Sequence, residues 1–221
     1  MDYEFLSNTR LFRGTSPQEA QQMLSCLAAV TRAYRKGETI YRAGEQICAA
    51  GLVLRGSVTV ESDDFWGNRS VLSRAAPGDI FGEAYACLPE QPLLVSVVAA
   101  ANCEVLFLDM ARVMRVCSNA CAHHSQLVSN VLQLTARKAQ SLAEHVNVLS
   151  QRTIRQKLLA YFGICRARSG SGTFVLTMTL TALADYLSVD RSAMMREMKR
   201  MKEEGVLSFR GRSVELYTSV Q

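Results

Sequence analysis

Residues 180–200, LTALADYLSVDRSAMMREMKR, predict two short helices separated by a tight turn. Leu183 and Leu187 lie one turn apart on the apolar side of the first helix, and Ser188-Val189 forms the break. Asp190 then stands at the N-cap position of the second helix, where its carboxylate can accept hydrogen bonds from free backbone N–H groups. Two short helices joined by such a turn form a helix-turn-helix.

The second of these helices separates apolar from polar side chains. Its methionines recur at spacings of three and four and predict a buried face; they are Met194, Met195, Met198 and Met201. The other face carries the residues that we expect to meet DNA, which are Arg191, Ser192, Arg196 and Lys199. A helix fits the major groove, and arginine can donate two hydrogen bonds to a guanine edge. The alternative is a helical hairpin whose charges are merely solvated.

A β-hairpin is predicted directly after the second helix. Residues 206–209 and 213–217 are extended in pattern, and the turn between them is Arg210-Gly211-Arg212. A hairpin in this place is a wing, and Arg210 and Arg212 at its tip can contact phosphate groups. The predicted C-terminal domain is therefore a winged helix-turn-helix.

Charge is unevenly distributed along the 221 residues. Residues 151–221 hold twelve Lys or Arg against six Asp or Glu, a net charge of +6, whereas residues 1–150 hold thirteen against fourteen, a net charge of −1. The two sum to the total of +5. A basic domain joined to a neutral one is typical of a nucleic-acid-binding module attached to a domain that does not touch the phosphate backbone.

Several classes of protein are disfavoured. There is no apolar run long enough for a membrane span, and the acidic start MDYEFLSNTR does not resemble a signal peptide, so we expect a cytoplasmic protein without a membrane partner. Seven cysteines without paired spacing do not indicate a disulfide framework. Because no nucleophile–base set or phosphate loop is found, we do not expect an enzyme and assign no catalytic residues.

Short extended runs separated by turn residues fill the chain from residue 32 to about residue 110. The turns contain glycine at Lys36-Gly37, Ala43-Gly44, Arg55-Gly56 and Pro77-Gly78. Even spacing of short strands predicts an antiparallel sandwich or barrel. Together with the helices on either side, the fold class is α+β.

The motifs of this region resemble the cyclic-nucleotide-binding β-roll of the CRP/FNR transcription regulators. They are Lys36-Gly37-Glu38, Ala43-Gly44-Glu45, Leu54-Arg55-Gly56-Ser57-Val58 and Pro77-Gly78-Asp79-Ile80-Phe81-Gly82-Glu83. The resemblance covers nearly the whole chain. It implies an N-terminal antiparallel β-roll (a double-stranded β-helix or jelly roll), then a long dimerisation helix and a winged helix-turn-helix. It also implies that Arg191, Ser192 and Arg196 occupy base-contacting positions.

A long helix without glycine or proline is predicted over residues 119–150. A heptad seam runs along it through Val128, Leu132, Thr135, Ala139, Leu142, Val146 and Leu149. A second apolar stripe, Leu127, Val131 and Leu134, lies on an adjacent face. One stripe can pack on the β-roll and the other on a second copy, so we expect a homodimer. The predicted domains are residues 1–118, 119–150 and 151–221.

The resemblance also identifies a candidate effector pocket. In cyclic-nucleotide-binding members of the family, a Gly-Glu pair binds the ribose and a later Arg-Ser pair neutralises the cyclic phosphate. Gly82-Glu83 matches the first pair, but Leu93 and Leu94 stand in place of the second, and no Lys or Arg lies between Arg74 and Arg112. A buried phosphate without a cation loses charge-assisted hydrogen bonds. We therefore expect an apolar or neutral effector, or no effector, in place of cyclic AMP, although Arg137 or Lys138 of the long helix could reach the pocket.

The interpretation of the whole chain is a regulator that binds a palindromic double-stranded operator under the control of an unidentified small molecule. The runner-up is a ligand-binding regulatory module that acts through a protein partner. Cys117, Cys121 and His124 share a helix face and offer a metal or redox alternative, and haem is another, but neither is specific enough to assign a metal site.

Overall fold

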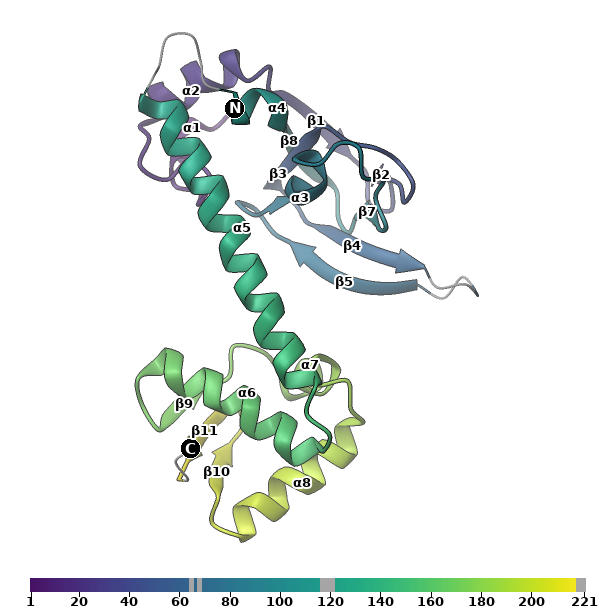
Figure 1. The fold of residues 1–221 in the computed structure, drawn as a ribbon, viewed down its shortest axis with the longest axis vertical. Coiled ribbons are helices and arrows are strands. Elements are labelled where there is room, and N and C mark those ends of the chain that lie inside the picture. Colours follow the sequence, from purple (N-terminus) through teal and green to yellow (C-terminus); the bar gives the residue numbers. More distant parts are fainter. Residues whose placement is uncertain (64–65, 67–68, 116–121, 218–221) are drawn as a thin grey trace. The chain divides into compact units, whose positions relative to one another are not determined.

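The structure is a computed structural model that describes residues 1–63, 66, 69–115 and 122–217 (Figure 1). It divides into two compact units, Met1–Arg137 and Lys138–Gln221. Helix α5 (Ala122–Leu149) begins in the first unit and ends in the second. The three-part division at residues 118 and 150 stays a prediction.

The first unit is built on two antiparallel four-stranded sheets. One has the strand order β1-β8-β3-β6 and the other β2-β7-β4-β5. The strands are β1 (Val30–Tyr34), β2 (Thr39–Tyr41), β3 (Ala49–Arg55), β4 (Val58–Asp63), β5 (Arg69–Ala75), β6 (Ile80–Phe81), β7 (Ser96–Ala99) and β8 (Cys103–Asp109). The predicted antiparallel β-roll is confirmed.

The same unit contains four short helices: α1 (Tyr3–Ser7), α2 (Pro17–Cys26), α3 (Glu83–Ala86) and α4 (Met110–Met114). Helix α2 begins at a capping box, in which the Ser16 hydroxyl accepts from the Glu19 N–H and the Glu19 carboxylate accepts from the Ser16 N–H. Pro17 at the first helical position lacks the N–H that would otherwise need a partner.

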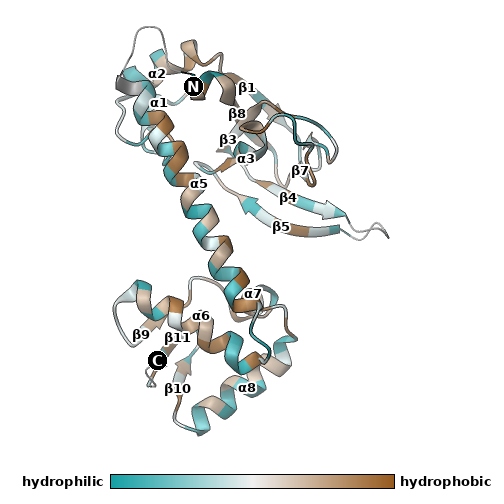
Figure 2. Cartoon of the chain, in the orientation of Figure 1, coloured by the Kyte–Doolittle hydropathy of each residue, from teal (hydrophilic) through white to brown (hydrophobic). Residues whose placement is uncertain are grey.

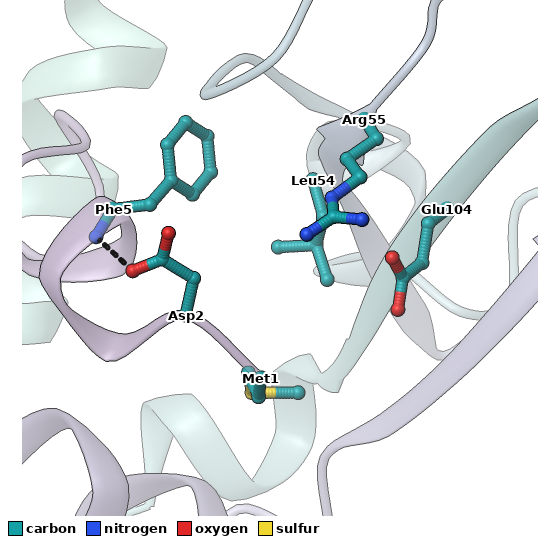
Figure 3. A pocket seen from close by; sticks show the side chains of 6 residues that line it. All are labelled: Met1, Asp2, Phe5, Leu54, Arg55 and Glu104. Atoms are coloured by element: carbon teal, nitrogen blue, oxygen red, sulfur yellow. Dashed lines mark hydrogen bonds between the residues drawn. The ribbon is translucent and has the colours of Figure 1, made fainter.

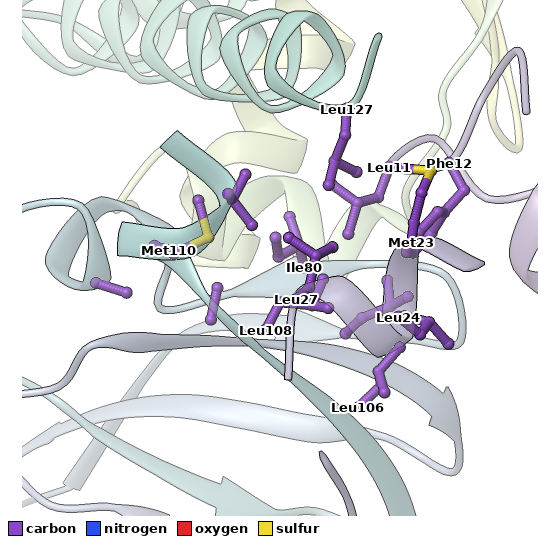
Figure 4. Packing of buried hydrophobic residues seen from close by; sticks show 14 of the residues in the cluster. Leu11, Phe12, Met23, Leu24, Leu27, Ile80, Leu106, Leu108, Met110 and Leu127 are labelled. Atoms are coloured by element: carbon purple, nitrogen blue, oxygen red, sulfur yellow. The ribbon is translucent and has the colours of Figure 1, made fainter. Parts of the chain in front are cut away.

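The main core of this unit joins the sheet to the N-terminal helices and to α5 (Figure 4). Side chains of β3 and β8 meet those of the segment before α2, of α2 itself and of α5; among them are Leu52, Leu106, Leu108, Leu11, Phe12, Leu24 and Leu127, all at most 8% exposed. Each buried side chain of this kind contributes about 1.5–3 kcal/mol to the stability of the fold. The first half of α5 is thus fixed to the β-roll by one of its faces.

The two apolar stripes of α5 have different environments. Leu127 is fully buried, and Val131 and Leu134 pack half-buried against the same core. The large apolar residues of the seam are exposed, namely Val128 (36%), Leu132 (69%), Leu142 (64%), Val146 (55%) and Leu149 (37%). Apolar residues recur among polar ones along this helix (Figure 2). A single chain therefore covers the stripe that begins at Leu127 and leaves the large apolar side chains of the seam exposed to solvent.

The second unit contains the end of α5, three further helices and one small sheet. Its elements are α6 (Ile154–Ser169), β9 (Thr173–Val175), α7 (Leu180–Tyr186), α8 (Arg191–Glu203), β10 (Leu207–Arg210) and β11 (Ser213–Leu216), with the strand order β10-β11-β9. The sequence predicts that α6 ends at Cys165, but it continues to Ser169, where Gly170 adopts the left-handed conformation (φ 67°) that closes the helix. A second core, separate from the first, includes Val148, Leu158, Phe162 and Leu183.

None of the helices in the described ranges is both long enough and apolar enough to cross a bilayer. The longest of them, α5, has 28 residues and carries polar side chains between its apolar ones.

Candidate functional site

The turn between α7 and α8 follows the sequence prediction closely. Ser188 takes a positive φ of 51°, which breaks the chain direction after α7. The Asp190 carboxylate accepts a hydrogen bond of 2.8 Å from the Ala193 N–H and caps α8. A free N–H at the start of a helix needs such an acceptor, so this contact defines where α8 begins.

Helix α8 has a buried face and an exposed face. The side chains of Met194, Met198 and Met201 are completely buried, while Met195 is half-buried. The four residues predicted to meet DNA are all exposed on the same helix, and they are Arg191, Ser192, Arg196 and Lys199. Of these, Lys199 makes an ion pair with Glu203 at 3.9 Å between two highly exposed side chains, a contact that contributes little stability. The methionines are core residues that orient the basic face outward.

The wing is a three-stranded sheet with the two predicted arginines at a hairpin tip. Strands β10 and β11 pair from Leu207↔Leu216 to Arg210↔Ser213, and Gly211 has a φ of 60° in the turn. Glycine accepts this left-handed backbone without strain, which is why a two-residue turn can close here. Arg210 and Arg212 are exposed. Their guanidinium groups are therefore available to a partner.

An ion-pair cluster that the sequence did not predict connects α6 with α8. Arg155 of α6 donates to the Glu204 carboxylate at 2.5 Å and lies 3.8 Å from Glu197. This hydrogen bond lowers the pKa of Glu204 and raises that of Arg155. Arg168 of α6 also pairs with Glu144 of α5. No local pattern indicates either pair, because the partners are far apart in the sequence.

Two of the predicted effector residues lie together at the start of α3. Gly82 is left-handed, with a φ of 73°, and a side chain there would approach Ile47 Cδ1 to 3.2 Å. Glu83 follows it and is only 5% exposed. A carboxylate this deeply buried needs hydrogen-bond or ionic partners, as in a structural or a ligand-binding role.

Leu93 and Leu94 diverge in the structure. Leu93 is 2% exposed and belongs to the main core, whereas Leu94 is 75% exposed. The backbone of Leu93 is held by the turn at Gly44-Glu45, through hydrogen bonds of 2.7 Å from the Gly44 N–H and 2.8 Å to the Glu45 carbonyl. Neither side chain supplies a charge where the resemblance implies a phosphate-binding pair.

Arg137 lies at a cavity that includes none of Gly82, Glu83, Leu93 and Leu94. That cavity is lined by Arg10, Arg13, Asn130, Gln133, Leu134 and Arg137. Lys138 belongs to the second compact unit. The six residues predicted for one effector pocket are therefore not brought together around this cavity, and their common role stays a prediction.

A larger cavity of about 490 Å³ lies beside α1 (Figure 3). Its lining is Met1, Asp2, Phe5, Leu54, Arg55 and Glu104. Arg55 and Glu104 are paired positions of β3 and β8, and they place opposite charges side by side. Asp2 is occupied in capping α1, accepting from the Phe5 N–H at 2.9 Å. None of the predicted effector residues lines this cavity.

The cysteines do not form a metal centre in the described part of the chain, where no three metal-ligating side chains cluster. Cys117 and Cys121 lie outside the described residues. The Nε2 atom of His124 is 2.6 Å from the Val113 carbonyl oxygen and is used in that hydrogen bond. Burial, with a smaller effect of Glu83, raises the pKa of the Cys87 thiol and disfavours the thiolate that binds metals.

Comparisons with known proteins agree with this architecture. Residues 31–120 match the cyclic nucleotide-binding domain family, and residues 151–217 match the Crp-like helix-turn-helix domain family. The Cyclic AMP receptor protein of Thermus thermophilus is 27% identical over 212 residues, covering 96% of this chain and 94% of the relative. The transcriptional activator protein FnrL of Cereibacter sphaeroides is 22% identical over 190 residues, or 82% of this chain and 73% of the relative.

Among solved structures, OCPA-complexed CprK has a TM-score of 0.63 at 13% identity, covering 90% of this chain and 92% of that one. At this identity the likeness concerns the fold alone. Both domain families occur in this chain, with the long helix α5 between the two matched ranges. This chain belongs to the CRP/FNR family of transcription regulators.

Proposed function

We propose that this protein is a homodimeric transcription regulator that reads DNA with α8 and holds the phosphate backbone with the wing. The observation that carries the proposal is the two-sided structure of α8, with Met194, Met198 and Met201 fully buried and the basic residues exposed. Arg191, Ser192 and Arg196 would meet base edges, while Lys199, Arg210 and Arg212 would contact phosphates.

The exposed seam of α5 supports the dimer. Five large apolar side chains at heptad positions lack cover in a single chain, and a second copy of the same seam would bury them. A two-fold dimer presents two α8 helices, which fits a palindromic operator with half-sites about 34 Å apart. An effector in the β-roll would shift the population toward the spacing that fits DNA.

We further propose that this effector is not cyclic AMP. Leu93 is part of the core and Leu94 points to solvent, so neither can neutralise a cyclic phosphate. Glu83, at the start of α3, is buried and carries a negative charge when ionised. The segment between Arg74 and Arg112 contains no lysine or arginine. An apolar or neutral effector fits these side chains better.

The test is a fluorescence-anisotropy titration of an operator selected from random DNA. Arg196→Ala removes a bidentate donor and is expected to cost about 1–3 kcal/mol of binding free energy on the selected site, with less discrimination at one base pair. The matched control is Arg74→Ala, which removes an exposed arginine from β5 of the other unit and leaves DNA affinity unchanged.

Two results would overturn the proposal. Equal weakening on every DNA sequence would assign Arg196 to the phosphate backbone rather than to a base. Binding that is weak and does not fall as salt rises would remove DNA as the partner, because phosphate contacts release counterions. The second result would favour a regulatory module that acts through a protein.

A further inference from the structure

Three arginines line a small cavity in the first unit, and of the predicted effector residues it includes Arg137 alone. Arg10 and Arg13 come from the segment between α1 and α2, and Arg137 comes from α5. The cavity has a volume of about 110 Å³, and its remaining lining is Asn130, Gln133 and Leu134. Residues more than 110 positions apart in the sequence thus face one space.

Hydrogen bonds and burial hold the backbone that carries Arg10 and Arg13, while the side chains of all three arginines are exposed. Asn130 of α5 is 4% exposed, and its side-chain amide donates to the Leu11 carbonyl at 2.9 Å and to the Arg13 carbonyl at 2.8 Å. Leu11 and Phe12 are buried in the main core. The backbone that carries Arg10 and Arg13 is therefore held against α5 by two hydrogen bonds, one on each side of the buried Phe12.

The cavity carries positive charge without an internal partner. Within the described residues, no carboxylate lies at ion-pair distance from Arg10, Arg13 or Arg137. Three guanidinium groups around one space repel one another and can each donate several hydrogen bonds. Gln133 adds a neutral amide to the lining. An anion with several acceptor oxygens is the ligand that satisfies this arrangement.

We propose that this cavity binds a phosphate group, either as inorganic phosphate or as the end of a small phosphomonoester. A cavity of about 110 Å³ has room for one tetrahedral oxyanion. Arginine forks match phosphate oxygens in geometry as well as in charge.

The site also stays open in the proposed dimer. At about 100° per residue, Asn130, Gln133 and Arg137 lie roughly half a turn around α5 from the seam through Val128, Leu132 and Thr135. A bound phosphate would screen the repulsion between the arginines and strengthen the contact between the N-terminal segment and α5. The ligand would in this way act on the helix that pairs in the dimer.

The experiment is a ³¹P NMR titration of the full-length protein without DNA, in a phosphate-free buffer at constant ionic strength. Inorganic phosphate and glycerol 3-phosphate are the two probes, and their relative affinities distinguish the free ion from a phosphomonoester. Arg137→Gln is expected to weaken binding by about tenfold or more, and Arg137→Lys by less, because lysine keeps the charge and loses the fork.

The control is Arg42→Gln, which removes an exposed arginine of the same unit that does not line this cavity. Binding to this variant should equal that of the unaltered protein. The proposal fails if Arg42→Gln and Arg137→Gln weaken phosphate binding equally, or if chloride at the same ionic strength displaces phosphate completely. Circular dichroism of each variant confirms that it is folded, and the DNA titration is scored separately, so failure here does not affect the proposed DNA binding.

Discussion

Helix α8 and the segment from Gly82 to Leu94 organise their side chains in different ways. In α8, a buried methionine recurs every third or fourth residue, and Arg196, Lys199 and Arg200 between them are exposed. In the other segment, Glu83 and Leu93 are buried in the β-roll while Leu94 is 75% exposed, and no repeat relates them. The first candidate surface follows from the geometry of a single helix, whereas the second depends on how loops pack onto a sheet.

The seam of α5 resembles α8 in one respect. In both, the periodicity of a single helix determines which side chains are exposed. Leu142→Glu replaces a seam side chain that is 64% exposed in the single chain. Each leucine covered in a dimer contributes about 1.5–3 kcal/mol, and a dimer loses two of them, so the dimer constant should fall by at least about a hundredfold. Sedimentation equilibrium measures this directly.

The matched control adds the same charge away from the seam. Gln140→Glu alters an exposed position on another side of α5 and should leave the dimer constant within a few fold of its starting value. If Leu142→Glu sediments like the unaltered protein, the seam is not the dimer contact, and the analogy between α5 and α8 is wrong.

Substitutions at Leu93 and Leu94 test the second region of the comparison, the segment from Gly82 to Leu94. Leu93→Arg places a charge in the main core and should destabilise the first unit by about 3–5 kcal/mol, whereas Leu94→Arg should change stability by less than about 0.5 kcal/mol. Urea unfolding followed by circular dichroism gives both values.

Cyclic AMP provides the second readout for these two variants. Restoring the charge at either position should not create cyclic AMP binding, since Leu93 fills the core and Leu94 points away from it. A stable Leu93→Arg variant that binds cyclic AMP in calorimetry would show that the core can open to hold the nucleotide, and that the two leucines alone exclude it.

Local signals predicted a large part of this structure. Asp190 does cap α8, Met194, Met198 and Met201 do form its buried face, and the Arg210-Gly211-Arg212 turn does join two strands. Each of these depends on residues within a few positions of one another. The helix α6 was predicted four residues too short because Arg166–Ser169 is polar but compatible with a helix, and the glycine after it is the actual end.

Long-range contacts left no such signal. Asn130 binds the backbone of Leu11 and Arg13, 119 and 117 positions away, and nothing around Asn130 in the sequence indicates this partner. Its place on the long helix makes Arg137 a candidate cation for the β-roll pocket, yet in the structure it lines a cavity with Arg10 and Arg13. The period of a helix gives the direction of a side chain and does not identify what lies opposite it.

The smallest expected effect concerns the ion pair that connects α6 to the end of α8. The hydrogen bond from Arg155 lowers the pKa of Glu204 below its ordinary value of 4.5. A carboxyl group with a lowered pKa in the folded state contributes stability that is present above pH 4.5 and is lost as the pH falls through the lowered value. Glu204→Gln should therefore flatten the acid limb of the stability curve slightly and leave stability at pH 7 nearly unchanged, because exposed ion pairs contribute little.

Thermal unfolding between pH 3 and pH 7 measures this difference, with Glu203→Gln as the control, since Glu203 pairs with the exposed Lys199 at 3.9 Å. An equal response from both variants would mean that Arg155 does not hold Glu204 more firmly than an ordinary surface pair. A weaker acid limb in Glu204→Gln alone, together with unchanged DNA affinity, would separate the support of α8 from its reading of bases. The exposed face of α8 would then depend on its methionines for its direction and on Arg155 only for the position of its C-terminal end.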